Sequence, residues 1–86
     1  MWVFTQHAMQ RIQERDYSMD EVAAVLNGEA PTIIYPSPRD SGVDLYFGCV
    51  GSKFIMIPVD RIRKTVITIR PMHTSEKTVY LKEAGL

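Results

Sequence analysis

The sequence predicts an α+β fold in which two N-terminal helices form an αα-hairpin that packs on a four-stranded antiparallel sheet. The clearest helix signals lie in residues 1–30, where apolar residues recur every three or four positions behind N-cap residues. From Pro31 onward, short apolar stretches of strand length are separated by turn-forming residues. With 86 residues, the chain is expected to form a single domain over residues 1–86.

Each of the two helices has a recognisable start. Thr5 is placed to cap a first helix that runs to about Asp16, with Ala8 and Ile12 on its apolar side. Residues 18–21 read Ser-Met-Asp-Glu, a capping box that starts a second helix. Asn27 and Gly28 are expected to end this helix in a left-handed conformation.

The strands are predicted at residues 32–35, 44–50, 53–59 and 64–70. Gly51 and Ser52 form a two-residue connection of type II′, and Pro58 indicates a sheet edge or a bulge. In the fourth strand, alternation places Val66 and Thr68 on one face and Ile67 and Ile69 on the other. The residues from Thr74 are expected to form a short C-terminal helix. The two N-terminal helices should cover one face of the sheet, which leaves the other face or the rim for a ligand.

Composition narrows the class of protein. The chain is 45% apolar and 23% charged, which is ordinary for soluble domains. Its single cysteine, Cys49, excludes an intramolecular disulfide and suits a reducing cytosol. No signal peptide is visible, and the longest apolar run, residues 54–59, is too short to span a bilayer. We therefore expect a cytoplasmic protein that is not inserted in a membrane.

Cofactor and metal motifs are missing from the sequence. The two histidines lack metal-ligand spacing, and no cluster of carboxylates accompanies them. There is no glycine-rich phosphate loop and no Gly-x-Ser-x-Gly elbow. We expect neither a metal nor a cofactor.

Charge is balanced overall but uneven along the chain. Ten basic and ten acidic residues give a formal net charge of zero. Residues 53–86 carry seven basic against three acidic residues, so this half could face a polyanion; the alternative is scattered, solvated charge. The candidate RNA-binding cations in this half are Lys53, Arg61, Arg63 and Lys64.

The first helix carries His7, Arg11 and Arg15 at four-residue steps, which aligns them in one ridge. A neutral imidazole in a first helical turn can act as a general base toward a hydroxyl proton. Arg11 can grip a phosphate with two hydrogen bonds and stabilise its developing charge. Arg15 extends the ridge as a candidate RNA contact.

A structural role is an alternative for each of these residues. His7 could satisfy a loop carbonyl or cap the helix, and Arg11 could pair with Asp20 or Glu21 of the second helix. Arg15 adjoins Glu14 and Asp16, which favours exposed, solvated surface.

The end of the last strand offers a second group of functional side chains. Arg70 and His73 could supply another cation and the acid partner that phosphoryl transfer requires. The alternative is a polar turn in which Thr74 or Ser75 caps the last helix. Tyr80 could stack on a base, or its ring could pack against the sheet.

The first helix also carries a family pattern, Phe4-Thr5-x-His7-Ala8-x-x-Arg11-x-x-x-Arg15, followed by Ser18-Met19-Asp20-Glu21-Val22. It resembles the opening of a small bacterial family that is placed with the toxin-like ribonuclease fold of barnase, EndoU, certain colicins and RelE (BECR). The ending, from Arg70-Pro71-Met72 to Glu76 and Tyr80, distantly resembles BrnT-type toxins.

The resemblance implies a metal-independent, RNA-cleaving toxin of a toxin–antitoxin system, with His7, Arg11 and Arg15 as counterparts of the family's motif residues. Toxins of this fold are usually basic, whereas this chain is neutral. Two kinds of family member would explain the neutral charge: one that has lost catalysis, or one that needs a ribosome to position its RNA.

Two hypotheses follow. In the first, the chain is a ribonuclease toxin that cleaves RNA through attack of the 2′-hydroxyl, with His7 as base, Arg11 as phosphate clamp, and Arg70 and His73 opposite them. Its partners would be RNA and an antitoxin protein. In the second, the chain is a non-catalytic binding or regulatory module, or a degenerate toxin of the same fold.

Overall fold

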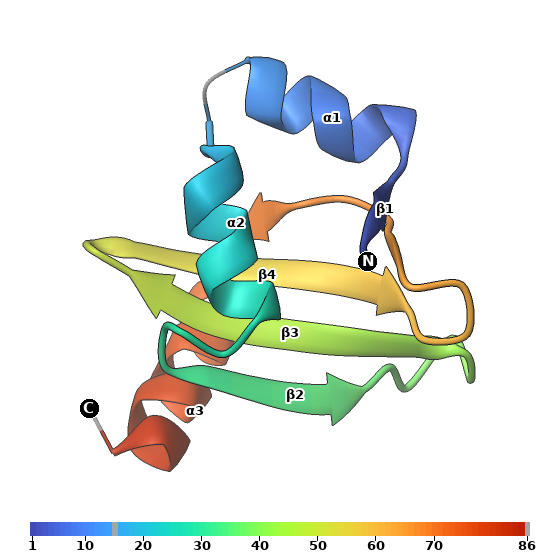
Figure 1. Cartoon of the computed structure of the whole chain (residues 1–86). Helices are drawn as coiled ribbons and strands as arrows, with labels where there is room; N and C mark the ends of the chain where they lie inside the picture. The colour runs from blue at the N-terminus through green and yellow to red at the C-terminus, as the bar shows by residue number, and fades with distance from the viewer. Residues whose placement is uncertain (15, 86) are drawn as a thin grey trace.

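The computed structural model describes residues 1–14 and 16–85. Within these residues the chain forms three helices and a six-stranded sheet, which confirms the α+β class (Figure 1). The elements in chain order are β1 (Val3–Phe4), α1 (Gln6–Gln13), α2 (Met19–Leu26), β2 (Thr32–Pro36), β3 (Val43–Val50), β4 (Lys53–Asp60), β5 (Thr65–Val66), β6 (Arg70–Pro71) and α3 (Thr74–Ala84).

The two N-terminal helices begin where their caps predict. The Thr5 side chain accepts from the backbone N–H of Ala8, and the Ser18 side chain accepts from that of Glu21. The Glu21 carboxylate in turn accepts from the backbone N–H of Ser18 at 2.8 Å, so the predicted capping box is present. Helix α1 is shorter than predicted, because it ends at Gln13 rather than near Asp16.

The prediction of a four-stranded antiparallel sheet is wrong. The described strands form one mixed sheet in the order β1-β5-β4-β3-β2, and β6 also pairs with β4. Strand β1 runs parallel to β5, whereas the other pairs are antiparallel. The hairpin between β3 and β4 has the predicted two-residue turn, with Val50 opposite Lys53 and a φ of 60° at Gly51.

The expected fourth strand is split into β5 and β6 by a bulge opposite Pro58. Val59 pairs with Val66, and Met56 pairs with Arg70. These pairs are three residues apart on β4 but four residues apart on the other segment, which therefore contains one extra residue. The extra residue places Val66 and Ile69 in the same core cluster. The predicted alternation, with these two residues on opposite faces, is therefore wrong.

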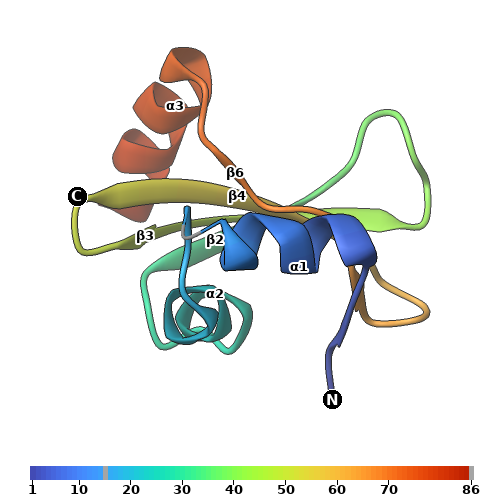
Figure 2. The same cartoon turned by 90° about the horizontal axis from the view of Figure 1, so that it is seen from above.

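Helices cover both faces of the sheet, as Figure 2 shows. Helices α1 and α2 lie on one face, and α3 lies on the other. The first face holds a cluster that includes Ile55, Ile57 and Val59, and the second holds a smaller cluster built on Phe47, Met56, Met72 and Tyr80. The apolar run of β4 is thus explained by burial on both faces. The second face, which we expected to be available for a ligand, is partly covered by α3.

Candidate functional site

Helix α1 places His7 and Arg11 one turn apart. The Thr5 hydroxyl anchors the start of this helix, because it also donates to the backbone carbonyl of Ile67 at 2.5 Å. His7 is exposed, and its side chain makes no hydrogen bond or ion pair with any other described residue. The structural roles considered for His7, helix cap and carbonyl partner, are therefore wrong: Thr5 is the cap. Arg15, the third member of the predicted ridge, lies outside the described residues.

Arg11 turns toward the link between α1 and α2. Its Nε lies 3.5 Å from Oδ2 of Asp16, so its acidic partner is neither Asp20 nor Glu21, as the structural alternative proposed. That Nε is buried and has no hydrogen-bond partner among the described residues. Among the described residues, the guanidinium therefore has Asp16 as its acidic partner, at the long end of the ion-pair range.

Tyr17, in the same link, is a site residue that sequence reasoning missed. Its side chain is buried. Burial raises the pKa of its hydroxyl, and the neighbouring Arg11 guanidinium offsets part of that rise. The available signal was its position, since a large aromatic residue in a short link between two capped helices has to pack beside both.

A surface depression of about 300 Å³ lies at this point. Its lining residues come from α1, the helix link, the start of β4 and the end of β6: Arg11, Asp16, Tyr17, Lys53, Phe54 and Pro71. A second, more open depression of about 490 Å³ shares Tyr17 and Lys53. Neither His7 nor His73 lines either depression.

Lys53 is committed to neighbours within the chain. Its Nζ donates to the backbone carbonyl of Asp16 at 3.2 Å and to Oε1 of Glu21 at 3.1 Å. The same ammonium lies 5.7 Å from the centre of the Tyr17 ring. Lys53 therefore ties the start of β4, the second strand of the hairpin, to the helix link.

Arg70, the cation expected opposite Arg11, is held by Glu76. Its two terminal nitrogens each donate to one carboxylate oxygen, both at 2.8 Å. The hydrogen bonds raise the pKa of Arg70 and lower that of Glu76, against a smaller opposing effect of burial. The Tyr17 phenol adds a smaller contribution to the raised pKa of Arg70.

His73 is the N-cap of α3, rather than Thr74 or Ser75 as the structural alternative proposed. Its backbone N–H donates to Oε1 of Glu76 at 2.7 Å, and its side chain is exposed. Glu76 thus binds both the strand end and the helix start. His73 is placed by this turn and not by a ligand site.

The remaining predicted RNA contacts are far from this end of the sheet. Arg61, Arg63 and Lys64 lie in the turn after β4, and Lys53 begins that strand. At about 3.3 Å per residue, the eight-residue strand separates them by roughly 25 Å. These positions favour the alternative that we considered, in which the basic residues of this half are scattered.

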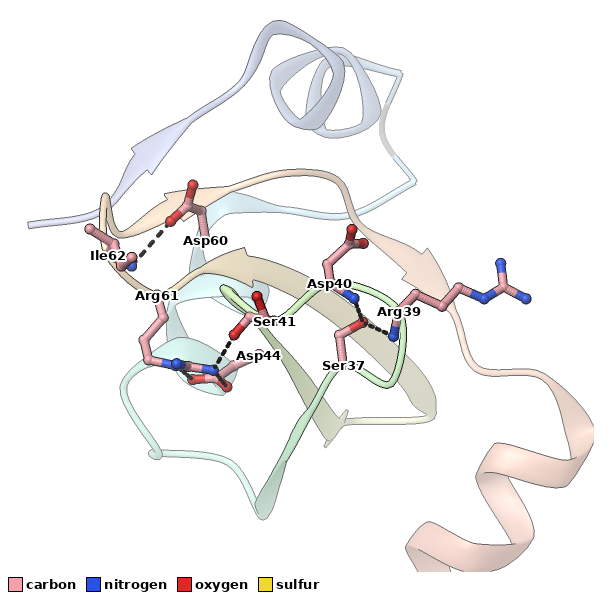
Figure 3. Close-up of polar contacts among 8 residues, drawn as sticks. All are labelled: Ser37, Arg39, Asp40, Ser41, Asp44, Asp60, Arg61 and Ile62. Atoms are coloured by element: carbon pink, nitrogen blue, oxygen red, sulfur yellow. Dashed lines mark hydrogen bonds and ion pairs between the residues drawn. The ribbon is translucent and has the colours of Figure 1, made fainter.

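Arg61 is bound within the chain, as Figure 3 shows. It donates to both oxygens of Asp44 at 3.1 Å and to the backbone carbonyl of Ser41 at 3.3 Å. The hydrogen bonds to Asp44 raise its pKa. In the same turn, Oδ1 of Asp60 accepts from the backbone N–H groups of Ile62 and Arg63.

Tyr80 has the structural role that we considered as the alternative to base stacking. It is buried, its hydroxyl donates to the carbonyl of Pro31 at 2.6 Å, and its ring meets Phe54 edge to face at 6.1 Å. Its ring is therefore unavailable for stacking on a base.

Two negative findings apply to residues 1–14 and 16–85. No group of three or more His, Cys, Asp or Glu side chains there could hold a metal ion. No helix in this part of the chain is both long and apolar enough to cross a membrane.

The comparisons with known proteins add no relative: no family model, no curated protein and no solved structure matches the chain.

Proposed function

We propose that the chain is a non-catalytic binding module of the toxin-like fold class that acts in the cytoplasm. Its binding site would be the depression lined by Arg11, Tyr17 and Lys53, which we call the Arg11 end of the sheet. The observation that carries this proposal is the pairing of Arg70 with Glu76 through two hydrogen bonds of 2.8 Å. The other cations of the site are paired as well, Arg11 with Asp16 and Lys53 with Glu21.

These pairs weigh against catalysis on a phosphodiester. Stabilising a transition-state phosphate requires donors that are free to turn toward it, and both terminal nitrogens of Arg70 are already occupied. An acid and a base must also approach the same phosphate from two sides. The candidate pair, His7 and His73, does not line the depression beside Arg11.

A protein is the partner class that fits best. The net charge of zero gives the chain no general attraction to a polyanion. The depression combines Arg11 and Asp16 with the rings of Tyr17 and Phe54. Charges of both signs beside aromatic side chains are typical of protein interfaces. The family resemblance agrees, because its members are often bound by an antitoxin.

One observation favours the second candidate, a metal-independent ribonuclease toxin. His7 is exposed and one helical turn from Arg11, whose side chain lines the depression. In that reaction His7 takes the proton of the ribose 2′-hydroxyl and O2′ bonds to phosphorus. The bond from phosphorus to O5′ breaks, and His73 gives O5′ its proton, while Arg11 and Arg70 bind the phosphate.

The experiment incubates the purified chain with RNA in EDTA, beside His7→Ala and the matched control Gln10→Ala, an exposed neighbour on the same helix. A binding module leaves RNA intact with all three proteins. Both positions are exposed, so neither change should alter the free energy of unfolding by more than about 0.5 kcal/mol. Cleavage that is kept in Gln10→Ala and lost in His7→Ala would overturn the module and establish the ribonuclease.

The site itself is tested with a co-expressed neighbouring gene product. If the Arg11 end binds it, Arg11→Glu should abolish co-purification, whereas Arg63→Glu at the far end of β4 should not. Growth arrest on expression of the chain alone, relieved by His7→Ala, would again support the toxin.

A further inference from the structure

Strand β2 forms an open edge of the sheet, and its hydrogen-bonding groups can be assigned. The backbone N–H of Ser37 donates to the carbonyl of Val43, and that of Arg61 donates to the carbonyl of Gly42. Along an antiparallel strand, every second residue directs its N–H and C=O groups to the same neighbouring strand. Since Ser37 bonds to β3, Ile33 and Tyr35 also bond to β3, while Thr32 and Ile34 direct their N–H and C=O groups outward. β2 is the last strand in the sheet order, and no strand of the described residues pairs with its outer edge.

This edge lacks most of the features that discourage strand pairing. Thr32–Pro36 contains no charged residue and no bulge, and Ile34 is 51% exposed. Exposed edge strands of soluble proteins usually carry a lysine, a proline or a bulge. Pro36 lacks an N–H at an outward-facing position, but it lies at the last residue and leaves Thr32 and Ile34 open.

We propose that β2 pairs with β2 of a second copy of this chain, in antiparallel orientation about a two-fold axis. With Ile33 opposite Ile33 of the second copy, Thr32 of each chain faces Ile34 of the other. Every outward N–H of Thr32 and Ile34 then meets a carbonyl, and the missing N–H of Pro36 falls outside these pairs. The strand is thus complementary to itself.

The surface beside β2 also favours a second copy. An apolar groove of about 270 Å³ runs between β2 and α3, and its lining includes Ile33, Tyr35, Phe47 and Val79. Val79, on α3, is 50% exposed. A two-fold axis normal to the sheet keeps both α3 helices on the same face, next to the joined strands. The net charge of zero means that two copies do not repel each other.

This interface is distinct from the site at the Arg11 end. The proposed dimer leaves Arg11, Lys53 and Arg70 uncovered. Lys53 begins β4 and Arg70 begins β6, and β3 separates both strands from the β2 edge, while Arg11 lies on α1. Loss of the dimer therefore says nothing about the proposed function, and the reverse also holds.

The first test measures the mass of the full chain by sedimentation equilibrium over a hundredfold range of concentration. We expect twice the chain mass of 9.8 kDa. Ile34→Lys should weaken the dimer at least about tenfold, since a lysine at an edge strand opposes pairing. The matched control is Ile62→Lys, at an 84% exposed isoleucine in the turn after β4, and it should stay dimeric.

The second test follows amide hydrogen exchange of single residues by NMR. In the dimer, the N–H groups of Ile34 and Tyr35 are both protected, whereas in a monomer only Tyr35 is protected because only it bonds to β3. Protection of both in the wild type, with loss at position 34 alone in Ile34→Lys, supports the pairing. A wild-type monomer at every concentration overturns it, as does protection of Ile34 only when a different protein is added.

Discussion

The hydroxyl of Thr5 donates to the backbone carbonyl of Ile67 at 2.5 Å, and this contact joins the first helix to the broken strand. The backbone N–H of Ile67 donates to the carbonyl of Pro58 at 2.9 Å. In an ordinary antiparallel pair, residue 58 would return a bond to the Ile67 carbonyl, but proline has no N–H. Thr5 supplies the missing donor. Its hydroxyl oxygen, Oγ1, also accepts a hydrogen bond from the backbone N–H of Ala8 at 3.1 Å.

Thr5→Val should therefore destabilise the fold through two losses at one side chain. It removes the N-cap of α1 and leaves the Ile67 carbonyl without its donor, which together cost about 2–3 kcal/mol. Chemical denaturation followed by circular dichroism measures the change. Thr5→Ser keeps the hydroxyl and should retain most of the stability; equal losses in both variants would show that the methyl group, not the hydroxyl, matters.

Gly48 lies where β3 passes under α2, and its lack of a side chain is required there. A Cβ at this position would lie 2.7 Å from Cγ2 and 2.8 Å from Cγ1 of Val25. Gly48→Ala should lower the free energy of unfolding by about 1–3 kcal/mol, because the helix must shift or Val25 must leave its rotamer. Gly42→Ala is the control, since nothing lies within 4 Å of its Cβ. Equal stability of the two variants would show that α2 moves without cost.

The pairing of Glu76 with Arg70 predicts an acid-sensitive contribution to stability. Hydrogen bonds from Arg70 lower the pKa of Glu76 below its usual 4.5. A carboxylate with a lowered pKa stabilises the folded state fully above its unfolded value and loses that contribution as pH falls through the folded value. The free energy of unfolding should therefore decrease as pH falls from about 5.

Glu76→Gln should reduce this dependence and cost about 1–2 kcal/mol at neutral pH, as measured by urea unfolding at a series of pH values. Some slope should remain, because hydrogen bonding to the Ser18 backbone also lowers the pKa of Glu21. Glu29→Gln removes the same charge from an exposed turn and controls for net charge. A steeper acid slope in Glu76→Gln than in the wild type would contradict the assignment.

Local signals in the sequence predicted the elements whose causes are local. The capping box needs only Ser18 and Glu21, three residues apart, and the tight hairpin needs only Gly51 and Ser52. The broken fourth strand has a distant cause. Pro58 acts on Ile67 across the sheet, and the donor that compensates for it comes from Thr5. Strand β1 is two residues long, which is too short for any periodicity.

The site could be predicted only in outline for the same reason. Arg11 and Arg70 were expected to lie opposite one another; Arg11 lines the depression, and Arg70 donates to the backbone carbonyl of Pro71, which also lines it. For Arg11 the acidic partner was not predicted, because the structural alternative named Asp20 or Glu21 and the structure has Asp16. The Arg70 pair depends on α3 beginning at Thr74, which places Glu76 beside the strand end. A residue pair six positions apart around a turn leaves no periodic signal.

Tyr80 offers a last distinction between a structural and an RNA-binding residue. Its hydroxyl donates to the Pro31 carbonyl at 2.6 Å and holds α3 against the start of β2. Tyr80→Phe should lower the free energy of unfolding by about 1 kcal/mol, through a lost hydrogen bond at a partly buried carbonyl. Tyr35→Phe is the matched control: its hydroxyl bonds to Glu83 at an exposed position, so its loss should cost less than about 0.5 kcal/mol. Thermal unfolding of both variants measures the difference. A Tyr80→Phe variant as stable as the wild type would show that this hydrogen bond does not hold α3 against β2.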